Sequence, residues 1–381
     1  MVAATATGLA VMELRHRLRP RSPLLLEPGP WQVEGSADRI LLSGRPTIRN
    51  PHNRMEVFVP AFQAHPTLLS MESVGGITLR VLVDPDHPDA QARSDGYWFS
   101  YIVKAGRQTA ARITIEISGP HLDALQAAWV EMRWTAYGPF GRQCQRHGVV
   151  IPLNRGAVPR PQAWRACDGC HLLPVPTHLL GWLDDPMAVL RDYALPHLRS
   201  GDIITIGETP LAVMQGRYRH PAMVRPGALA RLLCRVFHPT SSLATACGLQ
   251  SLIDLVGPTR VSFAWIGGIL LRLVGQRGGF YRLAGEQARL IDDLTGTLPP
   301  YDQTIVLGPA DPQAQVDNLA ACLGHPVAVV DVNDLGRVKL LASSRGCDDA
   351  LLRRALATNP AGNADEGTPI VIVRPTPAGG G

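Results

Sequence analysis

Apolar and polar residues alternate along much of the first half of the chain. In residues 112–117 (RITIEI) this alternation places Ile113, Ile115 and Ile117 on one face of an extended strand. Comparable segments recur between turn-forming residues; they are MEVFV, ITLRVLV, YWFSYIV and WVEMRWTAY. Short strands with little helix between them predict an antiparallel β-sandwich of immunoglobulin-like type over residues 31–153.

The pattern changes to alternating helices and strands in the second half of the chain. Apolar runs bounded by turn residues, such as GDIITI at residues 201–206, follow or precede segments of helical spacing. This alternation predicts an α/β or α+β domain over residues 176–381. Residues 154–175 are rich in Pro, Gly and Arg and are predicted to form a linker, and residues 1–30, rich in Pro and Arg, a flexible arm.

A strand–helix–strand unit is predicted within residues 291–337. Residues 304–307 (TIVL) and 326–332 (PVAVVDV) are short apolar runs that predict strands. Asp311 followed by Pro312 predicts the start of the helix between them, with the Asp311 side chain as the N-cap.

Acidic groups lie at both ends of this unit. Asp331, Asn333 and Asp334 end the second strand, and Asp292 and Asp293 precede the first. Ligands of open α/β sheets bind beyond the carboxyl ends of the strands. One acidic group therefore stands where a metal or a phosphate would be held. The alternative is that these acids are solvated turn residues and caps, and Asp293 is predicted to be a solvated neighbour of Asp292.

Composition favours small anionic ligands. The net charge is +5, and the basic residues form no aromatic–basic repeat, so no nucleic-acid partner is expected. The two lysines, Lys104 and Lys339, stand outside any Gly-rich GK[ST] motif, which excludes a P-loop. Phosphate groups would have to meet arginines, backbone N–H groups or a metal. Arg277, in the loop GQRGG, is one such candidate.

The cysteines indicate the cellular compartment, and two of them belong to a local motif. Seven cysteines are scattered along the chain, which predicts a reducing compartment and a cytoplasmic protein. The first residues lack the charge order of a secretory signal. Cys167, Cys170 and His171 form C-x-x-C-H, a pattern that suits covalent haem, zinc or neither, and we expect no haem.

The most apolar stretch is residues 261–274 (VSFAWIGGILLRLV). It is too short to span a bilayer and contains Arg272, so no transmembrane segment is expected. It predicts a buried helix, and the alternative is contact with a membrane surface.

Three segments of the second half carry a resemblance. They are GDIITIGETPLAVMQGR from Gly201, TIVLGPADPQ with VAVVDVNDLGR from Thr304 to Arg337, and NADEGTPIVIVR from Asn363. In order and spacing, residues 174–375 resemble the gamma-glutamyl ligases that extend the deazaflavin coenzyme F-420. The first half is assigned to no family.

The resemblance implies a ligase-like fold and an activity. Members of that family join glutamate to a phosphate-bearing acceptor through an amide bond, with GTP or ATP and Mg²⁺ or Mn²⁺. A divergent ligase of this kind is therefore expected, and a non-catalytic relative that serves as a nucleotide-binding or interaction module is the alternative. A protein partner for the sandwich and a homodimer are left open.

The resemblance also assigns site residues, although no catalytic residue. Asp292 resembles the metal-binding Asp of the family, Asn333 and Asp334 replace its Asp-Thr pair, and Asp331 is a substitute ligand. Thr295 is the nearest polar group to a missing Asn. The residues expected to contact the nucleotide or its phosphates are Arg217, Arg277, Arg337, Thr295 and Asn363. The chain departs from the family at Glu208-Thr209, in place of Gln-Lys, and at Ala212-Val213, in place of Ser-Lys.

Overall fold

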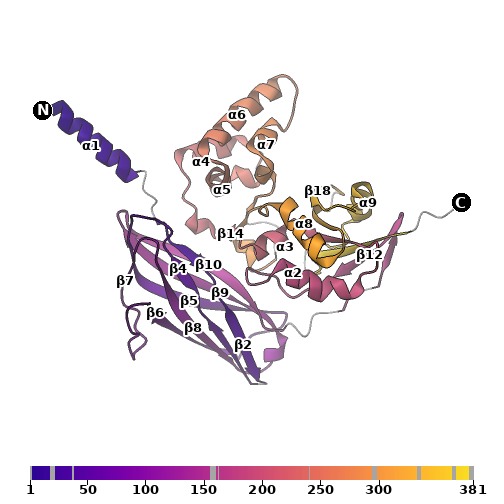
Figure 1. Cartoon of the computed structure of the whole chain (residues 1–381), viewed down its shortest axis with the longest axis horizontal. Helices are drawn as coiled ribbons and strands as arrows, with labels where there is room; N and C mark the ends of the chain where they lie inside the picture. The colour runs from indigo at the N-terminus through magenta and orange to yellow at the C-terminus, as the bar shows by residue number, and fades with distance from the viewer. Residues whose placement is uncertain are drawn as a thin grey trace. The chain divides into compact units, whose positions relative to one another are not determined.

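The chain divides into two compact units, Met1–Leu153 and Asn154–Gly381. The structure is a computed structural model (Figure 1), and it describes residues 2–17, 22–36, 38–154, 160–161, 163–239, 241–293, 298–332, 336–362 and 366–376. The predicted positions Thr295, Asn333, Asp334 and Asn363 lie outside the described residues. No helix in the described part of the chain has the length and apolar character needed to cross a membrane.

The first unit contains two antiparallel sheets. One has the strand order β1 (Leu25–Glu27), β4 (Thr47–Arg49), β8 (Gln108–Ser118), β3 (Arg39–Gly44) and β2 (Trp31–Ser36), with β6 (Thr78–Asp86) also paired to β8. The other has the order β10 (Gly141–Pro152), β9 (Leu125–Gly138), β5 (Val57–Ser70) and β7 (Tyr101–Val103).

Alternating side chains give each sheet a buried face. Ile113, Ile115 and Ile117 on β8 are fully buried, as are Val130 and Met132 on β9. The predicted antiparallel, immunoglobulin-like sandwich is confirmed. The flexible arm over residues 1–30 is wrong in part, because Val2–Arg17 forms helix α1 and β1 pairs with β4.

The second unit is built on a mixed six-stranded sheet. Its order is β11 (Arg165–Cys167), β12 (Cys170–Val175), β19 (Ile370–Pro375), β13 (Ile203–Gly207), β17 (Val327–Val332) and β18 (Val338–Ser343). Strands β13 and β17 run parallel, and the other described pairs of this sheet are antiparallel. The linker predicted over residues 154–175 is therefore too long, because β11 and β12 belong to this sheet.

Helices cover both faces of this sheet. On one face, Ile204, Ile206 and Val329 pack against three helices, α2 (Pro186–Val189), α3 (Glu208–Met214) and α8 (Pro312–Leu323). The helical turns that continue α2 to His197 pack against the same face. The opposite face packs Ile203 and Val330 against α9 (Asp349–Ala355). Because helices cover both faces, the side chains that alternate between the two faces are mostly apolar. The strands therefore appear in the sequence as nearly continuous apolar runs.

The rest of the second unit contains a small sheet and a helical bundle (Figure 1). The antiparallel strands β14 (Tyr218–Arg219), β16 (Ile305–Val306) and β15 (Asp292–Asp293) form the sheet. The bundle consists of α4 (Ala228–Leu233), α5 (Ala246–Val256), α6 (Pro258–Leu273) and α7 (Gly279–Ala284), which share a core with Ile291, Ile305 and Leu307.

Two local predictions are corrected here. The predicted first strand of the strand–helix–strand unit, β16, lies in the small sheet and pairs with Asp292 and Asp293 instead of joining β17. Asp311 precedes α8 with a left-handed backbone (φ 42°) and makes no side-chain cap hydrogen bond, so Pro312 alone marks the helix start.

Candidate functional site

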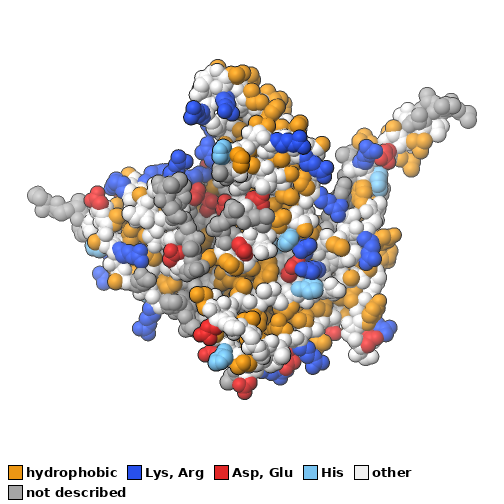
Figure 2. All heavy atoms as spheres, turned by 180° about the vertical axis from the view of Figure 1, so that it is seen from behind, with side chains coloured by type: hydrophobic (Ala, Val, Ile, Leu, Met, Phe, Trp, Pro, Cys, Tyr) orange, Lys and Arg blue, Asp and Glu red, His pale blue; other side chains and the backbone are white. Residues whose placement is uncertain are grey.

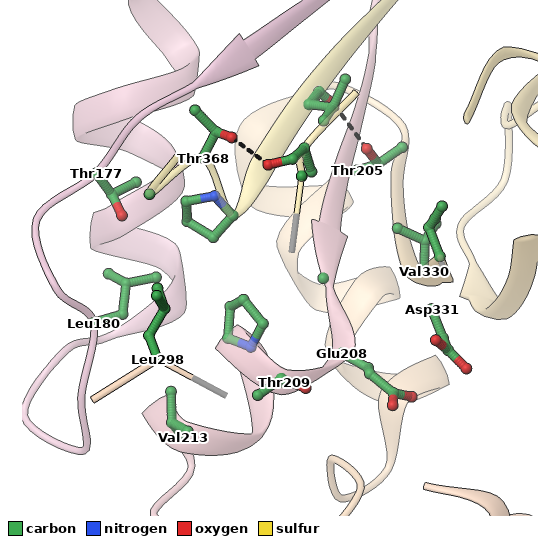
Figure 3. Close-up of a pocket in the computed structure, with 18 of the residues that line it drawn as sticks. Thr177, Leu180, Thr205, Glu208, Thr209, Val213, Leu298, Val330, Asp331 and Thr368 are labelled. Atoms are coloured by element: carbon green, nitrogen blue, oxygen red, sulfur yellow. Dashed lines mark hydrogen bonds between the residues drawn. The ribbon is translucent and has the colours of Figure 1, made fainter. Parts of the chain in front are cut away.

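A cavity of about 370 Å³ opens in the second unit at the carboxyl ends of the parallel strands β13 and β17. Its size falls in the usual range for small-molecule sites. Figure 3 shows Thr205 of β13, Glu208 at the start of α3 and Asp331 of β17 on one side of it. Thr177 and Leu180 lie on the other side. The apolar part of the wall consists of Leu180, Val213, Leu298, Tyr301, Val330 and Leu356.

Three carboxylates from three different elements line this cavity. Glu208 is the first residue of α3, directly after β13, and Asp331 lies near the end of β17. Figure 3 shows the carboxyl groups of these two residues at the same end of the cavity. Asp292 comes from β15 in the small sheet.

Burial and neighbouring charge disfavour the ionised forms of these carboxylates. Burial, followed by the negative charges of Asp331 and Asp292, raises the pKa of Glu208 to about 9. Burial and the charge of Asp331 raise the pKa of Asp292 to about 6. Burial also raises the pKa of Asp331, against the opposing effect of Lys339. The cluster therefore holds negative charge poorly and favours a cation.

One cation is already part of this cluster. Lys339 on β18 pairs with Asp331 across the antiparallel ladder. Within the described part of the chain, neither the buried Nζ of Lys339 nor the buried Oε2 of Glu208 has a hydrogen-bond partner. Buried polar atoms are normally satisfied. These two atoms thus mark the place where a ligand would complete the site.

The donor set suits a hard divalent ion. Carboxylate oxygens are the ligands that Mg²⁺ and Mn²⁺ prefer, and the orphaned Glu208 oxygen adds one to those of Asp292 and Asp331. Among the described residues, no three His, Cys, Asp or Glu side chains are already close enough to hold a metal. The residues present fit such an ion by the chemistry of their oxygen donors.

The structure separates the predicted arginines from the predicted acids. Asp292 and Asp331 line the cavity, whereas Arg217, Arg277 and Arg337 are absent from its described lining. Arg217 donates hydrogen bonds to the Gly308 carbonyl and the Gln287 side chain. Arg277 and Arg337 are exposed. Contact of these three arginines with phosphate stays a prediction.

Two charged residues of the site were missed by the sequence analysis. Glu208 ends the apolar run GDIITIG, so the rule for strand ends would have found it had it been applied to β13 as well as β17. Arg289 also lines the cavity, and its guanidinium lies 6.0 Å from the centre of the Tyr281 ring. No motif singled out Arg289.

A buried hydrogen-bond network supports the opposite wall. The Nδ1 atom of His178 lies 2.6 Å from the Tyr193 hydroxyl, and its Nε2 lies 2.9 Å from a carboxylate oxygen of Asp184. The second Asp184 oxygen accepts a hydrogen bond from the Gly181 amide. The Tyr301 hydroxyl donates to the Leu180 carbonyl. These bonds hold the segment containing Thr177 to Leu180 in place along the cavity.

Asp293 is buried, and the prediction of a solvated neighbour is wrong. Its side chain is 7% exposed and accepts a hydrogen bond from the Thr245 hydroxyl. The same hydroxyl caps α5 by accepting from the Gly248 amide. Strand alternation directs Asp292 towards the cavity and Asp293 towards the bundle.

The C-x-x-C-H motif forms a tight β-hairpin. Cys167 and Cys170 pair directly across the turn between β11 and β12. Burial and the adjacent Cys167 thiol raise the pKa of Cys170 to about 11, so this thiol is protonated near neutral pH. His171 follows Cys170 on β12 and points to the opposite face of the sheet. The two thiols and the imidazole therefore do not converge.

Solved structures that are similar to part of this chain are distant. The GAE domain of yeast GGA1 is 10% identical, covers 35% of this chain and 96% of its own, and superposes with a TM-score of 0.22. The GAE domain of GGA2p from Saccharomyces cerevisiae is 9% identical, covers 35% of this chain and 95% of its own, and has a TM-score of 0.21. The PapD-like domain of human CEP192 is 11% identical, covers 35% of this chain and 87% of its own, and has a TM-score of 0.18. Likeness at this level carries no functional argument.

A comparison with curated proteins finds no match. A family model does match the first unit, which the sequence analysis had left without a family. The matched region ends at residue 155, at the very start of the second unit, and the resemblance of that unit to the ligases stays a prediction. Residues 25–155 match the family model described as "F420-0:gamma-glutamyl ligase, N-terminal Ig-like domain", and this domain relates the chain to that ligase.

Proposed function

We propose that the second unit is a divergent gamma-glutamyl ligase, which joins glutamate through an amide bond to a phosphate-bearing acceptor. The reaction uses GTP or ATP and a divalent metal, Mg²⁺ or Mn²⁺. The N-terminal domain supports this proposal, because its family model is described as part of such a ligase. The resemblance of residues 201–217, 304–337 and 363–374 supports it from the other half of the chain.

The observation that carries the proposal is the convergence of Glu208, Asp292 and Asp331 on one cavity at the ends of parallel strands. A carboxylate is a poor acylating agent until it is phosphorylated, and phosphoryl transfer depends on positioning and on neutralising charge. A bound metal supplies that neutralisation. Asp292 and Asp331 hold it, and Glu208 is the third oxygen donor.

The chain must bind phosphate groups without the Ser-Lys pair of the family. Ala212 and Val213 stand at those positions and are buried, so they contribute packing and no donor. Arg289 lines the cavity, and the charge of Lys339 acts on Glu208 and Asp331. In this proposal Arg289 contacts the nucleotide phosphates and Lys339 limits repulsion among the acids before the metal binds.

A second candidate function is a non-catalytic nucleotide-binding or interaction module. One observation favours it. Lys339 already places a positive charge beside Asp331 and Glu208, where the ligase would need a metal. If Lys339 replaces the metal, the fold is kept and phosphoryl transfer is lost.

Calorimetry on the full chain tests the site directly. Mg²⁺ or Mn²⁺ should bind, and GTP or ATP should bind mainly as the metal complex. Asp292→Asn and Asp331→Asn should each weaken metal and nucleotide binding together, by about tenfold or more. Asp317→Asn is the matched control, because Asp317 is exposed on α8 and bonds to Gln313.

Two results would count against the proposal. One is the absence of metal and nucleotide binding to the wild type at millimolar concentration. The other is equal binding by Asp292→Asn, Asp331→Asn and the Asp317→Asn control, which would place the ligand elsewhere.

A further inference from the structure

Helix α6 exposes an apolar face, although its sequence predicts a buried helix. The side chains of Phe263 and Leu273 are 75% and 78% exposed. Exposed apolar residues recur between these two at spacings of three and four residues, and such residues share one side of a helix. We call this side the α6 face, and it consists of Phe263, Ile266, Ile269, Leu270, Leu273 and Val274.

Packing on the other side of the helix fixes this orientation. Val261 and Ala264 are buried in the bundle core. Gly267 and Gly268 face α7 so closely that an added Cβ would lie 2.6 Å from a methyl group of Leu283 or 2.9 Å from the Phe280 amide nitrogen. The helix therefore has a side built to pack against α7, and the α6 face is left outward.

The surroundings of the α6 face are strongly basic. Residues 221–285 contain seven arginines, no lysine and one acidic residue, Asp254. All seven arginines are exposed, and Asp254 is paired with Arg219 at 2.8 Å. In the part of the chain that the structure describes, no ion pair involves any of the seven, which are Arg225, Arg231, Arg235, Arg260, Arg272, Arg277 and Arg282.

Apolar and cationic side chains are intermixed on this surface. Figure 2 shows hydrophobic and Lys or Arg side chains side by side over the part of the molecule that is uppermost in the view, where the bundle lies. Leu232 in α4 and Val236 in the helical turn that follows it are also exposed. Exposed apolar patches of this kind mark interaction sites.

We propose that the α6 face and its arginines form a docking surface for an anionic membrane. Helices that lie in the membrane interface combine an outward apolar face with Arg or Lys, and anionic headgroups attract such segments. A second copy of the chain fits less well, because it would bring arginine-rich surfaces together with a single, already paired, acid between them. The lipid bilayer satisfies both the apolar face and the charge.

Binding to vesicles tests this proposal on the full chain. The wild type should sediment with vesicles of phosphatidylcholine mixed with phosphatidylglycerol, and much less with phosphatidylcholine alone. Raising the ionic strength should weaken binding, because the Debye length falls from about 10 Å at 0.1 M salt to about 3 Å at 1 M.

Two sets of variants separate the apolar contribution from the charge. Phe263→Gln combined with Leu273→Gln should reduce partitioning at least tenfold, since each buried side chain of this size contributes about a tenfold gain or more. Arg272→Gln combined with Arg282→Gln should reduce partitioning to the anionic vesicles about fivefold per arginine.

Matched controls lie in the first unit. Met71→Gln replaces an equally exposed apolar residue, and Arg54→Gln with Arg107→Gln removes two exposed arginines. These variants should bind as the wild type does. All substituted side chains are exposed, and unchanged melting temperatures should verify that each variant is folded.

Three outcomes would overturn the proposal. They are no binding of the wild type to either vesicle, equal binding to neutral and anionic vesicles, and unchanged binding of the Phe263→Gln/Leu273→Gln variant. A concentration-dependent dimer that the same variant abolishes, without vesicle binding, would assign the α6 face to a second copy of the chain.

Discussion

Glu208 is an acidic residue whose ionisation depends strongly on the fold. Its pKa is raised to about 9 in the folded chain from an ordinary value of 4.5. Between these two values the unfolded chain loses the proton while the folded chain keeps it. The folded state then binds more protons, so the free energy of unfolding falls as the pH rises through this window.

Removal of the Glu208 carboxyl should therefore flatten the pH dependence of stability. Without divalent metal, the wild type should lose up to about 1.4 kcal/mol per pH unit from this group between pH 5 and 8. Glu208→Gln should lose that slope and gain stability at pH 8. Thermal unfolding of the full chain across this range measures it, with exposed Glu286→Gln as the control. Parallel slopes for wild type and Glu208→Gln would refute the assignment.

Adjacent residues Asp292 and Asp293 should respond in opposite directions to substitution. Asp292→Asn removes a buried charge that Asp331 repels, so it should stabilise the metal-free chain at pH 7.5 and abolish stabilisation by Mn²⁺. Asp293→Ala removes the acceptor of the Thr245 hydroxyl and should destabilise by about 2 kcal/mol. Urea titrations with and without Mn²⁺ measure both, and effects of the same sign would contradict this account.

The residue scale also shows what local pattern can predict. Asp292 and Asp331 were found because they follow or precede apolar runs, and both line the cavity. Asp293 was misjudged because its burial depends on Thr245, which lies 48 residues earlier in the chain. The sequence places Glu208 at a strand end, but its proximity to Asp292 and Asp331 depends on β15 and β17, and no sequence window contains all three.

At the scale of elements, strand prediction succeeded where alternation or apolar runs are long. Strands β8 and β9 show the period-two pattern, and β17 begins with the apolar run VAVV. Strand β16 has two residues, so its pairing is decided by tertiary contacts with β14 and β15. Helix α6 was predicted to be buried because hydrophobicity alone does not report which side has a partner.

The α6–α7 pair depends on glycine at the contact. Gly268→Ala would place a methyl group 2.9 Å from the Phe280 backbone nitrogen, and the helices would have to separate. We expect a loss of about 1–3 kcal/mol in the free energy of unfolding. Gly8→Ala in α1 meets no atom within 4 Å and should leave stability unchanged or slightly higher. Similar melting temperatures for Gly268→Ala and the wild type would contradict the close packing.

At the scale of the whole molecule, the chain consists of two units with separate cores. The change from period-two to helical spacing marked this division in the sequence, but the predicted linker was too long. Strand β12 pairs with β19 across the sheet, and Arg374 on β19 holds Asp202 through two hydrogen bonds of 2.8 and 2.7 Å. The pairings of β11 with β12 and of β12 with β19, which no local pattern reveals, bring residues 165–175 into the main sheet of the second unit.

Limited proteolysis should locate the boundary. Trypsin should cut between residues 154 and 164 and leave two folded fragments, because residues 165–175 are paired in the main sheet. Fragment masses from electrospray spectrometry identify the cut, and circular dichroism of each fragment reports its fold. Early cleavage within β12, or within both units, would contradict this division.

If the second unit forms an amide bond, the glutamylated product reports it directly. The full chain is incubated with coenzyme F420-0, glutamate, Mn²⁺ and GTP or ATP, and the acceptor is weighed by mass spectrometry. The ligase account predicts that the acceptor gains one glutamyl residue for each nucleotide hydrolysed. It also predicts that Asp292→Asn and Asp331→Asn abolish this gain while Asp317→Asn retains it. Nucleotide binding without any mass gain would contradict the ligase account and favour the nucleotide-binding module.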